Sequence, residues 1–251
     1  NLSAWRHHFD RAAELLGARI NGAGNTIRQH ADGPPQKFSR LQAMAPHNSF
    51  RAAAITVAMA NSTSYGNVAL TKCLRCGDCA TGCNFGAKNS LDVNLLVSAH
   101  QKGAEIFSGA TVLYIEPDGS NWIVNTVYTN ATLRKRDKEP LKIRASKVVL
   151  AAGTLGSNEI LLRSNAKGLQ LASSHLGRRC STNGDMLITD YATKSKVDTV
   201  ADEAVQPSTR AIGPTITGVI DLRATDGVLI EEMSVPAGLR LAFAEVFATI
   251  N

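Results

Sequence analysis

The sequence predicts a mixed α/β (α+β) fold built from a β-meander, a strand–turn–helix unit and a second, sheet-based region. Three segments alternate apolar and polar residues as half-buried strands do, namely 111–116, 122–128 and 142–145. Polar turns separate them, so we expect three consecutive strands to pair as a meander. The apolar run 147–153 then ends in a glycine, and helical periodicity resumes over 157–164.

Other elements follow the same periodicities. Helical patterns cover residues 1 to about 20, ending at Gly22–Gly24, and also 50–60 and 90–102, with a loop around Pro34 and Pro35. A short strand is expected over 104–107. After residue 185 the pattern favours strands, and the expected ones cover 186–189, 218–221 and 228–231.

Composition indicates a globular protein, because 251 residues with 44% hydrophobic and 19% charged content can bury a substantial core. The net charge of +6 is spread thinly, and the basic run 134–138 is interpreted as a solvated loop rather than a nucleic-acid contact. No apolar run approaches the roughly eighteen residues of a membrane span. The chain opens without Met, so we expect it to be the interior of a longer polypeptide.

Four cysteines crowd into one short stretch. Their spacing, C-x2-C-x2-C-x3-C, can bring four thiolates around one loop, as an iron–sulfur cluster or, less favoured here, a zinc ion needs. The predicted ligands are Cys73, Cys76, Cys79 and Cys83. Paired disulfides or reduced structural cysteines remain open alternatives, because Cys180 stands alone and no second cysteine set completes a ferredoxin pattern.

The strand–turn–helix unit over 148–162 is a second candidate site. Small residues between a buried strand and a helix let the backbone approach a nucleotide closely and direct helix amides at a phosphate. The segment lacks the G-x-G-x-x-G dinucleotide fingerprint. Taken alone, the turn is equally compatible with a purely structural role.

Four motifs give the chain a family resemblance. Segments 86–92 (GAKNSLD), 151–157 (AAGTLGS), 183–185 (NGD) and 236–239 (PAGL) resemble, in order and spacing, the middle of glucose-methanol-choline (GMC) oxidoreductases of the cholesterol oxidase branch. The resemblance extends from about Cys73 to the C-terminus. It implies FAD as cofactor and oxidation of the CH–OH group of a hydrophobic, sterol-like alcohol.

The resemblance also implies a division of the chain. Residues 1–70 would form a helical and loop segment, 71–185 part of a GMC-type FAD-binding domain with the cysteine loop and the meander, and 186–251 the start of a substrate-binding domain. Carried over position by position, it implies cofactor-binding roles near the adenine, the glycine turn and the isoalloxazine. These residues are Val112, then Ala152, Gly153 and Gly156, then Asn183 and Gly184.

Glu231 matches the glutamate that acts as base in cholesterol oxidases when counted back from Pro236–Gly238. A carboxylate in an apolar pocket has a raised pKa and can accept a substrate proton. The match is imperfect, because Glu232 stands where the family has an apolar residue and Ser234 replaces a proline. A surface glutamate pair at a strand end remains the alternative interpretation.

The resemblance further implies that the family's catalytic His and Asn lie beyond Asn251 and that its pyrophosphate-binding unit precedes Asn1. We therefore expect this piece alone to be inactive unless another chain or the missing termini complete it. The expected partners, besides the hydrophobic alcohol, are an electron acceptor or a complementing polypeptide. Two alternatives remain open, an iron–sulfur electron-transfer subunit and a non-catalytic fragment. The compartment is open as well, although thiolate ligands would favour the cytoplasm.

Overall fold

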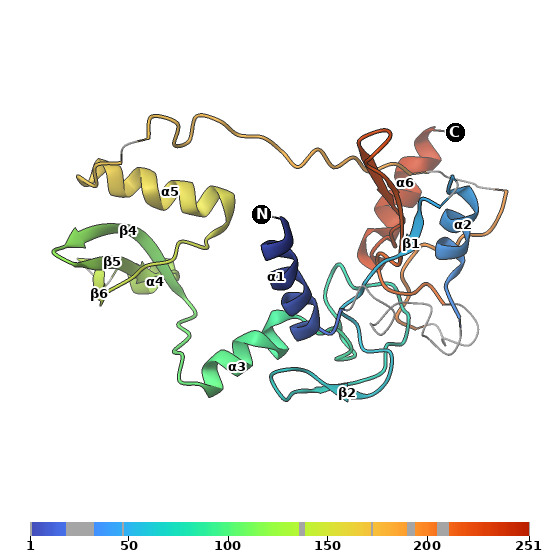
Figure 1. The fold of residues 1–251 in the computed structure, drawn as a ribbon, viewed down its shortest axis with the longest axis horizontal. Coiled ribbons are helices and arrows are strands. Elements are labelled where there is room, and N and C mark those ends of the chain that lie inside the picture. Colours follow the sequence, from blue (N-terminus) through green and yellow to red (C-terminus); the bar gives the residue numbers. More distant parts are fainter. Residues whose placement is uncertain are drawn as a thin grey trace. The chain divides into compact units, whose positions relative to one another are not determined.

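The structure is a computed structural model, and its chain divides into two compact units (Figure 1). Unit 1 comprises Asn1–Ala104 and Thr189–Asn251, and unit 2 comprises Glu105–Ile188. The structure describes residues 2–18, 33–46, 48–135, 139–171, 173–189, 194–204 and 211–250.

Unit 2 contains the predicted β-meander. Strands β4 (Ala110–Asp118), β5 (Asn121–Tyr128) and β6 (Leu141–Ala145) form an antiparallel sheet in the order β4-β5-β6. A register shift between Val112 and Tyr114 puts a bulge into β4. The short helix α4 (Ala131–Arg134) follows β5, and the Asn130 side chain accepts a hydrogen bond from the Thr132 N–H at its start. The three-strand prediction is confirmed.

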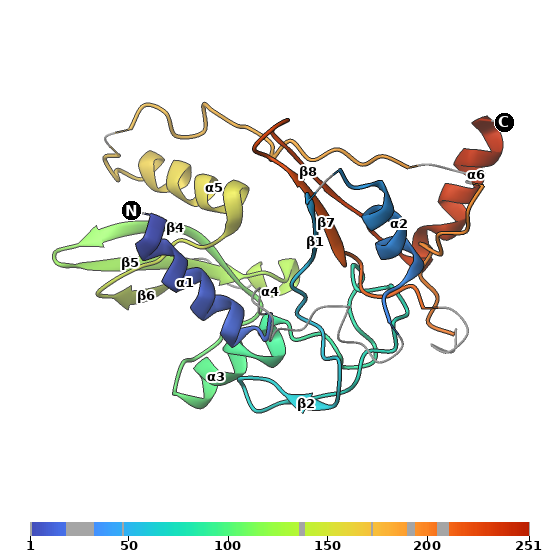
Figure 2. The same ribbon diagram turned by 45° about the vertical axis from the view of Figure 1, so that its right-hand side comes forward.

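Helix α5 (Gly153–Ala166) completes unit 2 and lies along the meander in both views (Figures 1 and 2). Ile160 of α5 and Ile115 of β4 are both buried. The Ser164 hydroxyl accepts a hydrogen bond from the Ile115 N–H at 2.9 Å and donates one to the Ile160 carbonyl at 2.7 Å. One face of α5 is thus fixed to β4 by apolar contact and by a buried hydrogen bond.

A second antiparallel sheet lies in unit 1, in the order β1-β7-β8. Its strands are β1 (Phe50–Ala52), β7 (Gly218–Leu222) and β8 (Val228–Glu231). Helix α2 (Gln36–Met44) packs against β7, and its buried Phe38 meets the Phe50 ring edge-on at 5.0 Å. Residues far apart in the sequence therefore share one core, which also includes Ala53, Ile55 and Val219.

The remaining elements of unit 1 lie outside this sheet. They are α1 (Leu2–Leu15), the hairpin of β2 (Ser62–Thr63) and β3 (Ala69–Leu70), the 3-10 helix η2 (Leu91–Val93), α3 (Leu95–Gln101), η3 (Ala237–Leu239) and α6 (Arg240–Ile250). Buried Asn94 donates to the Leu15 carbonyl at 2.9 Å, which ties the end of α1 to η2. Within the described ranges, no helix is both long and apolar enough to cross a membrane.

Several expected elements differ from the structure. Segment 147–151 has no strand partner among the described residues, and its Val149 side chain is 88% exposed. Segments 104–107 and 186–189 are likewise not strands. The predicted helix over 50–60 is instead β1 followed by irregular chain, because pairing with β7 outweighs the weak helical signal of small residues. The expected helix end at Gly22–Gly24 lies outside the described residues.

Candidate functional site

The small-residue turn at the start of α5 is open. Gly153, the first helical residue, has φ +72°, and an added Cβ there would meet nothing within 4 Å. Ala152 precedes it without a side-chain cap, and its N–H donates to the Ser157 hydroxyl at 3.2 Å. Gly156 lies on the same turn, where an added Cβ would come within 3.1 Å of the Ala152 Cβ. Close packing within the turn and open space outside it let a ligand approach the backbone.

Val112 lies on β4, which pairs only with β5 among the described residues. Half of the backbone N–H and C=O groups of an edge strand face away from its sheet and can pair with another molecule. The bulge after Val112 further interrupts the ladder at this point. The edge of β4 beside Val112 has no strand partner among the described residues, although the Ile115 N–H further along is bonded to Ser164. This edge and the open glycine turn both fit the dinucleotide cofactor that the family resemblance implies.

Asn183 and Gly184 lie in an exposed stretch after α5. The Asn183 side-chain amide donates to Asp185 Oδ2 at 2.6 Å, and Gly184 has φ +78°. Gly184 supplies the positive φ that most residues avoid, and Asn183 Oδ1 accepts the Asp185 N–H at 3.5 Å. All six predicted cofactor-binding residues therefore lie in unit 2, whereas Glu231 lies in unit 1.

Glu231 ends strand β8 opposite Val219 of β7, and its side chain is exposed. The described residues do not enclose it in the apolar pocket that the sequence led us to expect. The neighbouring carboxylate, Glu232, is only 9% exposed and receives a hydrogen bond from the fully buried ammonium of Lys37 at 2.5 Å. The two adjacent glutamates thus have opposite environments.

Glu232 is held by a dense set of donors. Its Oε1 accepts the N–H groups of Thr217 at 2.7 Å and Gly218 at 2.8 Å, and also the Thr217 hydroxyl. Lys37 donates further to the carbonyls of Pro214 and Thr215 at 2.7 and 2.9 Å. Burial lowers the pKa of Lys37, and the carboxylate of Glu232 beside it acts in the opposite direction. Sequence reasoning missed Lys37 entirely.

Ser234 connects the segment after β8 to the cysteine loop. Its side chain is fully buried, its hydroxyl donates to the Gly77 carbonyl at 2.5 Å, and its N–H donates to the Thr215 carbonyl at 3.0 Å. Three residues later, the Ala237 N–H donates to Asp78 Oδ1 at 3.4 Å. The two departures from the family pattern, Glu232 and Ser234, are therefore the residues that anchor this segment.

The cysteine loop is described completely. Cys73, Cys76, Cys79 and Cys83 are all free thiols, as is the exposed Cys180. The Cys73 sulfur accepts the Arg75 N–H at 3.3 Å, and the Cys83 sulfur accepts the Ala87 N–H at 3.4 Å. Burial raises the pKa of Cys73 to about 12, and burial also raises the pKa of Cys76. The two groups are stabilised as neutral thiols.

The predicted iron–sulfur or zinc site on Cys73, Cys76, Cys79 and Cys83 is not supported. Within the described part of the chain, no group of three or more His, Cys, Asp or Glu side chains is placed to hold a metal ion. The alternative of an iron–sulfur electron-transfer subunit loses its structural basis with this site.

Comparison with known proteins assigns part of the chain. A family model described as GMC oxidoreductase matches residues 39–182. Cholesterol oxidases from two strains of Mycobacterium tuberculosis are each 34% identical over 176 residues, which cover 63% of this chain and 30% of the relative. A cholesterol oxidase from Acinetobacter baumannii is 32% identical over 122 residues, which cover 46% of this chain and 22% of the relative. The match thus spans under a third of each of these relatives, and no solved structure matches.

Proposed function

Because this chain belongs to the GMC oxidoreductase family, we propose that it forms part of an FAD-dependent enzyme that oxidises the CH–OH group of a hydrophobic, sterol-like alcohol. The observation that carries the proposal is the open turn at the start of α5, where Gly153 has φ +72° and free space beyond it. The names of the relatives, which are cholesterol oxidases, support the alcohol class.

The flavin-facing residues of this chain would act mainly through their backbones. Ala152, Gly153 and Gly156 would let the cofactor contact the first turn of α5, where helix N–H groups have no intrahelical partner. Val112 would bind the adenine end through the free edge of β4, and Asn183 and Gly184 would lie near the isoalloxazine. When bound, FAD supplies the hydride acceptor for the carbinol C–H.

Glu231 is proposed as the residue that takes a proton from the substrate. Its exposure at the end of β8 leaves the carboxylate accessible to an incoming molecule. Ile230 and Met233, on either side of the glutamate pair, are 45% and 40% exposed and offer apolar surface to a sterol-like substrate. The proposed substrate-binding region begins near residue 186, within the division 1–70, 71–185 and 186–251.

The first test is binding of FAD by the purified chain, followed through the quenching of flavin fluorescence. We expect saturable binding that is weakened at least tenfold in Gly153→Val, whose side chain would occupy the open space. Gly119→Val is the matched control, because Gly119 in the β4–β5 turn also has positive φ (+60°) and nothing within 4 Å. Equal affinity in both variants, or no saturable binding by the unmodified chain, would contradict the proposed flavin site.

The second test addresses the chemistry. With FAD, an artificial electron acceptor and a complementing polypeptide present, sterol oxidation should fall by roughly 10²–10⁴-fold in Glu231→Gln, the range for loss of a general base. Glu105→Gln, an exposed glutamate outside the proposed site, is the control. Unchanged turnover in Glu231→Gln would remove Glu231 from the mechanism while leaving the flavin site intact.

A further inference from the structure

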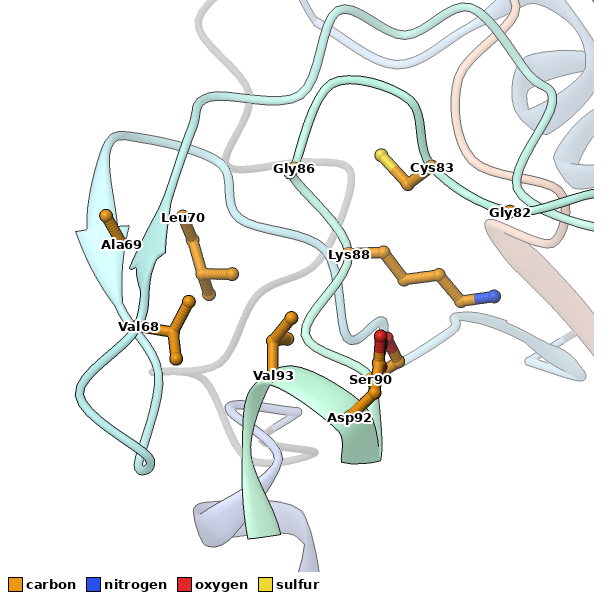
Figure 3. Close-up of a pocket in the computed structure, with 10 residues that line it drawn as sticks. All are labelled: Val68, Ala69, Leu70, Gly82, Cys83, Gly86, Lys88, Ser90, Asp92 and Val93. Carbon is orange, nitrogen blue, oxygen red and sulfur yellow. Dashed lines mark hydrogen bonds between the residues drawn. The ribbon is translucent and has the colours of Figure 1, made fainter. Parts of the chain in front are cut away.

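A pocket of about 350 Å³ lies beside the cysteine loop in unit 1 (Figure 3). Its volume is at the lower end of the range of small-molecule sites, about 300–1,000 Å³. Val68, Leu70 and Val93 form an apolar side, and the polar lining includes Cys83, Lys88 and Asp92. The pocket therefore combines a nucleophilic sulfur with one cationic and one anionic side chain.

Cys83 is the cysteine that lines this pocket, whereas Cys76 and Cys79, which are also half-buried, do not. It lines the pocket and is half-buried, with its sulfur accepting the Ala87 N–H at 3.4 Å. Cys73 lies in a buried cluster with Val57 and Ala87, and the residue is only 8% exposed. Cys180 is exposed in unit 2. Cys83 is thus a thiol beside which a second molecule has room to bind before any reaction.

The charges of the pocket are fixed by their own contacts. Lys88 Nζ donates to the Cys79 carbonyl at 3.0 Å, which holds the ammonium against the cysteine loop. Asp92 Oδ1 accepts the Ser90 hydroxyl at 2.5 Å, and this hydrogen bond is the largest cause of the lowered pKa of Asp92. Figure 3 shows Lys88 extended between Cys83 above it and the oxygen atoms of Ser90 and Asp92 below it. A ligand that carries both charges matches this arrangement.

We propose that Cys83 is a modification site that takes a small disulfide bearing both carboxylate and ammonium groups, such as oxidised glutathione. A ligand carboxylate would pair with Lys88 and a ligand ammonium with Asp92. The Cys83 sulfur attacks one sulfur of the disulfide, a new S–S bond forms, and the original S–S bond breaks. The departing half leaves as a thiolate and takes the proton released by Cys83, so Cys83 is oxidised and the departing half is reduced.

The test maps disulfide exchange on the reduced, full chain. The protein is incubated without oxygen at one fixed pH with oxidised glutathione, and adducts on each cysteine are followed by peptide mass spectrometry. Dicationic cystamine and neutral 2-hydroxyethyl disulfide are the comparison reagents, and the exposed Cys180 is the internal reference for intrinsic reagent reactivity. We expect Cys83 to react first with glutathione, and its rate relative to Cys180 to be highest with that reagent.

Variants then test the charge recognition. Lys88→Met should lower the Cys83 to Cys180 rate ratio for glutathione about fivefold, the size of one solvent-screened ion pair. Lys102→Met is the matched control, because Lys102 lies over the Tyr65 ring and not in the pocket. An internal disulfide that includes Cys83 supports the proposal where the Cys83 adduct precedes it in the time course, and it contradicts the proposal where an adduct on another cysteine comes first.

Two results would overturn the proposal. The first is modification of Cys180 or another cysteine ahead of Cys83, and the second is a rate ratio that is the same for all three reagents. The first result is measured on the unmodified chain. It therefore contradicts the proposal even where a variant fails to fold. The readout is an adduct mass rather than flavin binding, which makes it independent of the proposed function.

Discussion

The segment around Glu231 in unit 1 and the glycine turn in unit 2 are held in different ways. After β8, buried polar contacts fix the chain, with Lys37 on Glu232 and Ser234 on the Gly77 carbonyl. At the start of α5, one face of the helix packs on β4 through Ile160, while Leu155 on the same helix is 82% exposed. One candidate site is supported by side-chain hydrogen bonds, and the other by backbone geometry with an open apolar face.

The two regions depend on contacts with the surrounding chain to different degrees. Buried polar groups are costly without partners, so the Lys37–Glu232 contact specifies one arrangement of α2, β7 and the end of β8. The turn at Gly153 makes no such demand and leaves its surface available for a ligand. Substitutions of the buried polar residues after β8 should therefore disturb folding, whereas substitutions in the turn at Gly153 should disturb binding.

Removal of Lys37 should have the largest effect on folding. Lys37→Met leaves Glu232 charged and buried, together with the Pro214 and Thr215 carbonyls, and we expect a loss of about 3–5 kcal/mol in the free energy of unfolding. Chemical denaturation measures this. The double variant Lys37→Met/Glu232→Gln removes both charges but keeps an amide oxygen for the Thr217 and Gly218 N–H groups, so it should recover part of the loss. A double variant less stable than Lys37→Met would contradict the unpaired Glu232 charge as the cause of the loss.

Ser234 should show a smaller effect of the same kind. Ser234→Ala removes the donor to the buried Gly77 carbonyl, and we expect a loss of about 1–3 kcal/mol in denaturation experiments. The matched control is Ser39→Ala on the exposed side of α2, which should change stability by less than about 0.5 kcal/mol. If the two variants were equally stable, the contact between the cysteine loop and the segment after β8 would not exist in solution.

The sequence was sufficient for elements whose signal is local. The meander follows from alternation within 111–145, and α5 from helical periodicity, and both are present. Segment 147–151 was not predictable in this way, because a strand needs a partner and none lies among the described residues. Helix α2 was missed because prolines precede it, although Pro35 lies at the N-cap, where its missing N–H removes no hydrogen bond within the helix.

The candidate site shows the same limit. The resemblance supplied a role for Glu231, whereas the charged partner of Glu232 is Lys37, which lies 195 residues earlier in the chain. No periodicity reports such a contact, and the only signal was that Glu232 and Ser234 depart from the family pattern. The cysteine spacing was an equally clear signal, but spacing does not show whether burial leaves the thiols neutral, as it favours for Cys73. The roles of the flavin residues and of Glu231 remain predictions.

The smallest effect is expected on the open face of α5, where it tests the comparison most sharply. Leu155→Ala should change the free energy of unfolding by less than about 0.5 kcal/mol, because the side chain already lies mostly in water. Ile160→Ala on the opposite face should cost about 2–5 kcal/mol, since it leaves a cavity against β4. Both are measured by denaturation of the chain without flavin. A large loss in Leu155→Ala would mean that this face is covered in solution, and the turn at Gly153 would then be held by packing as firmly as the segment after β8.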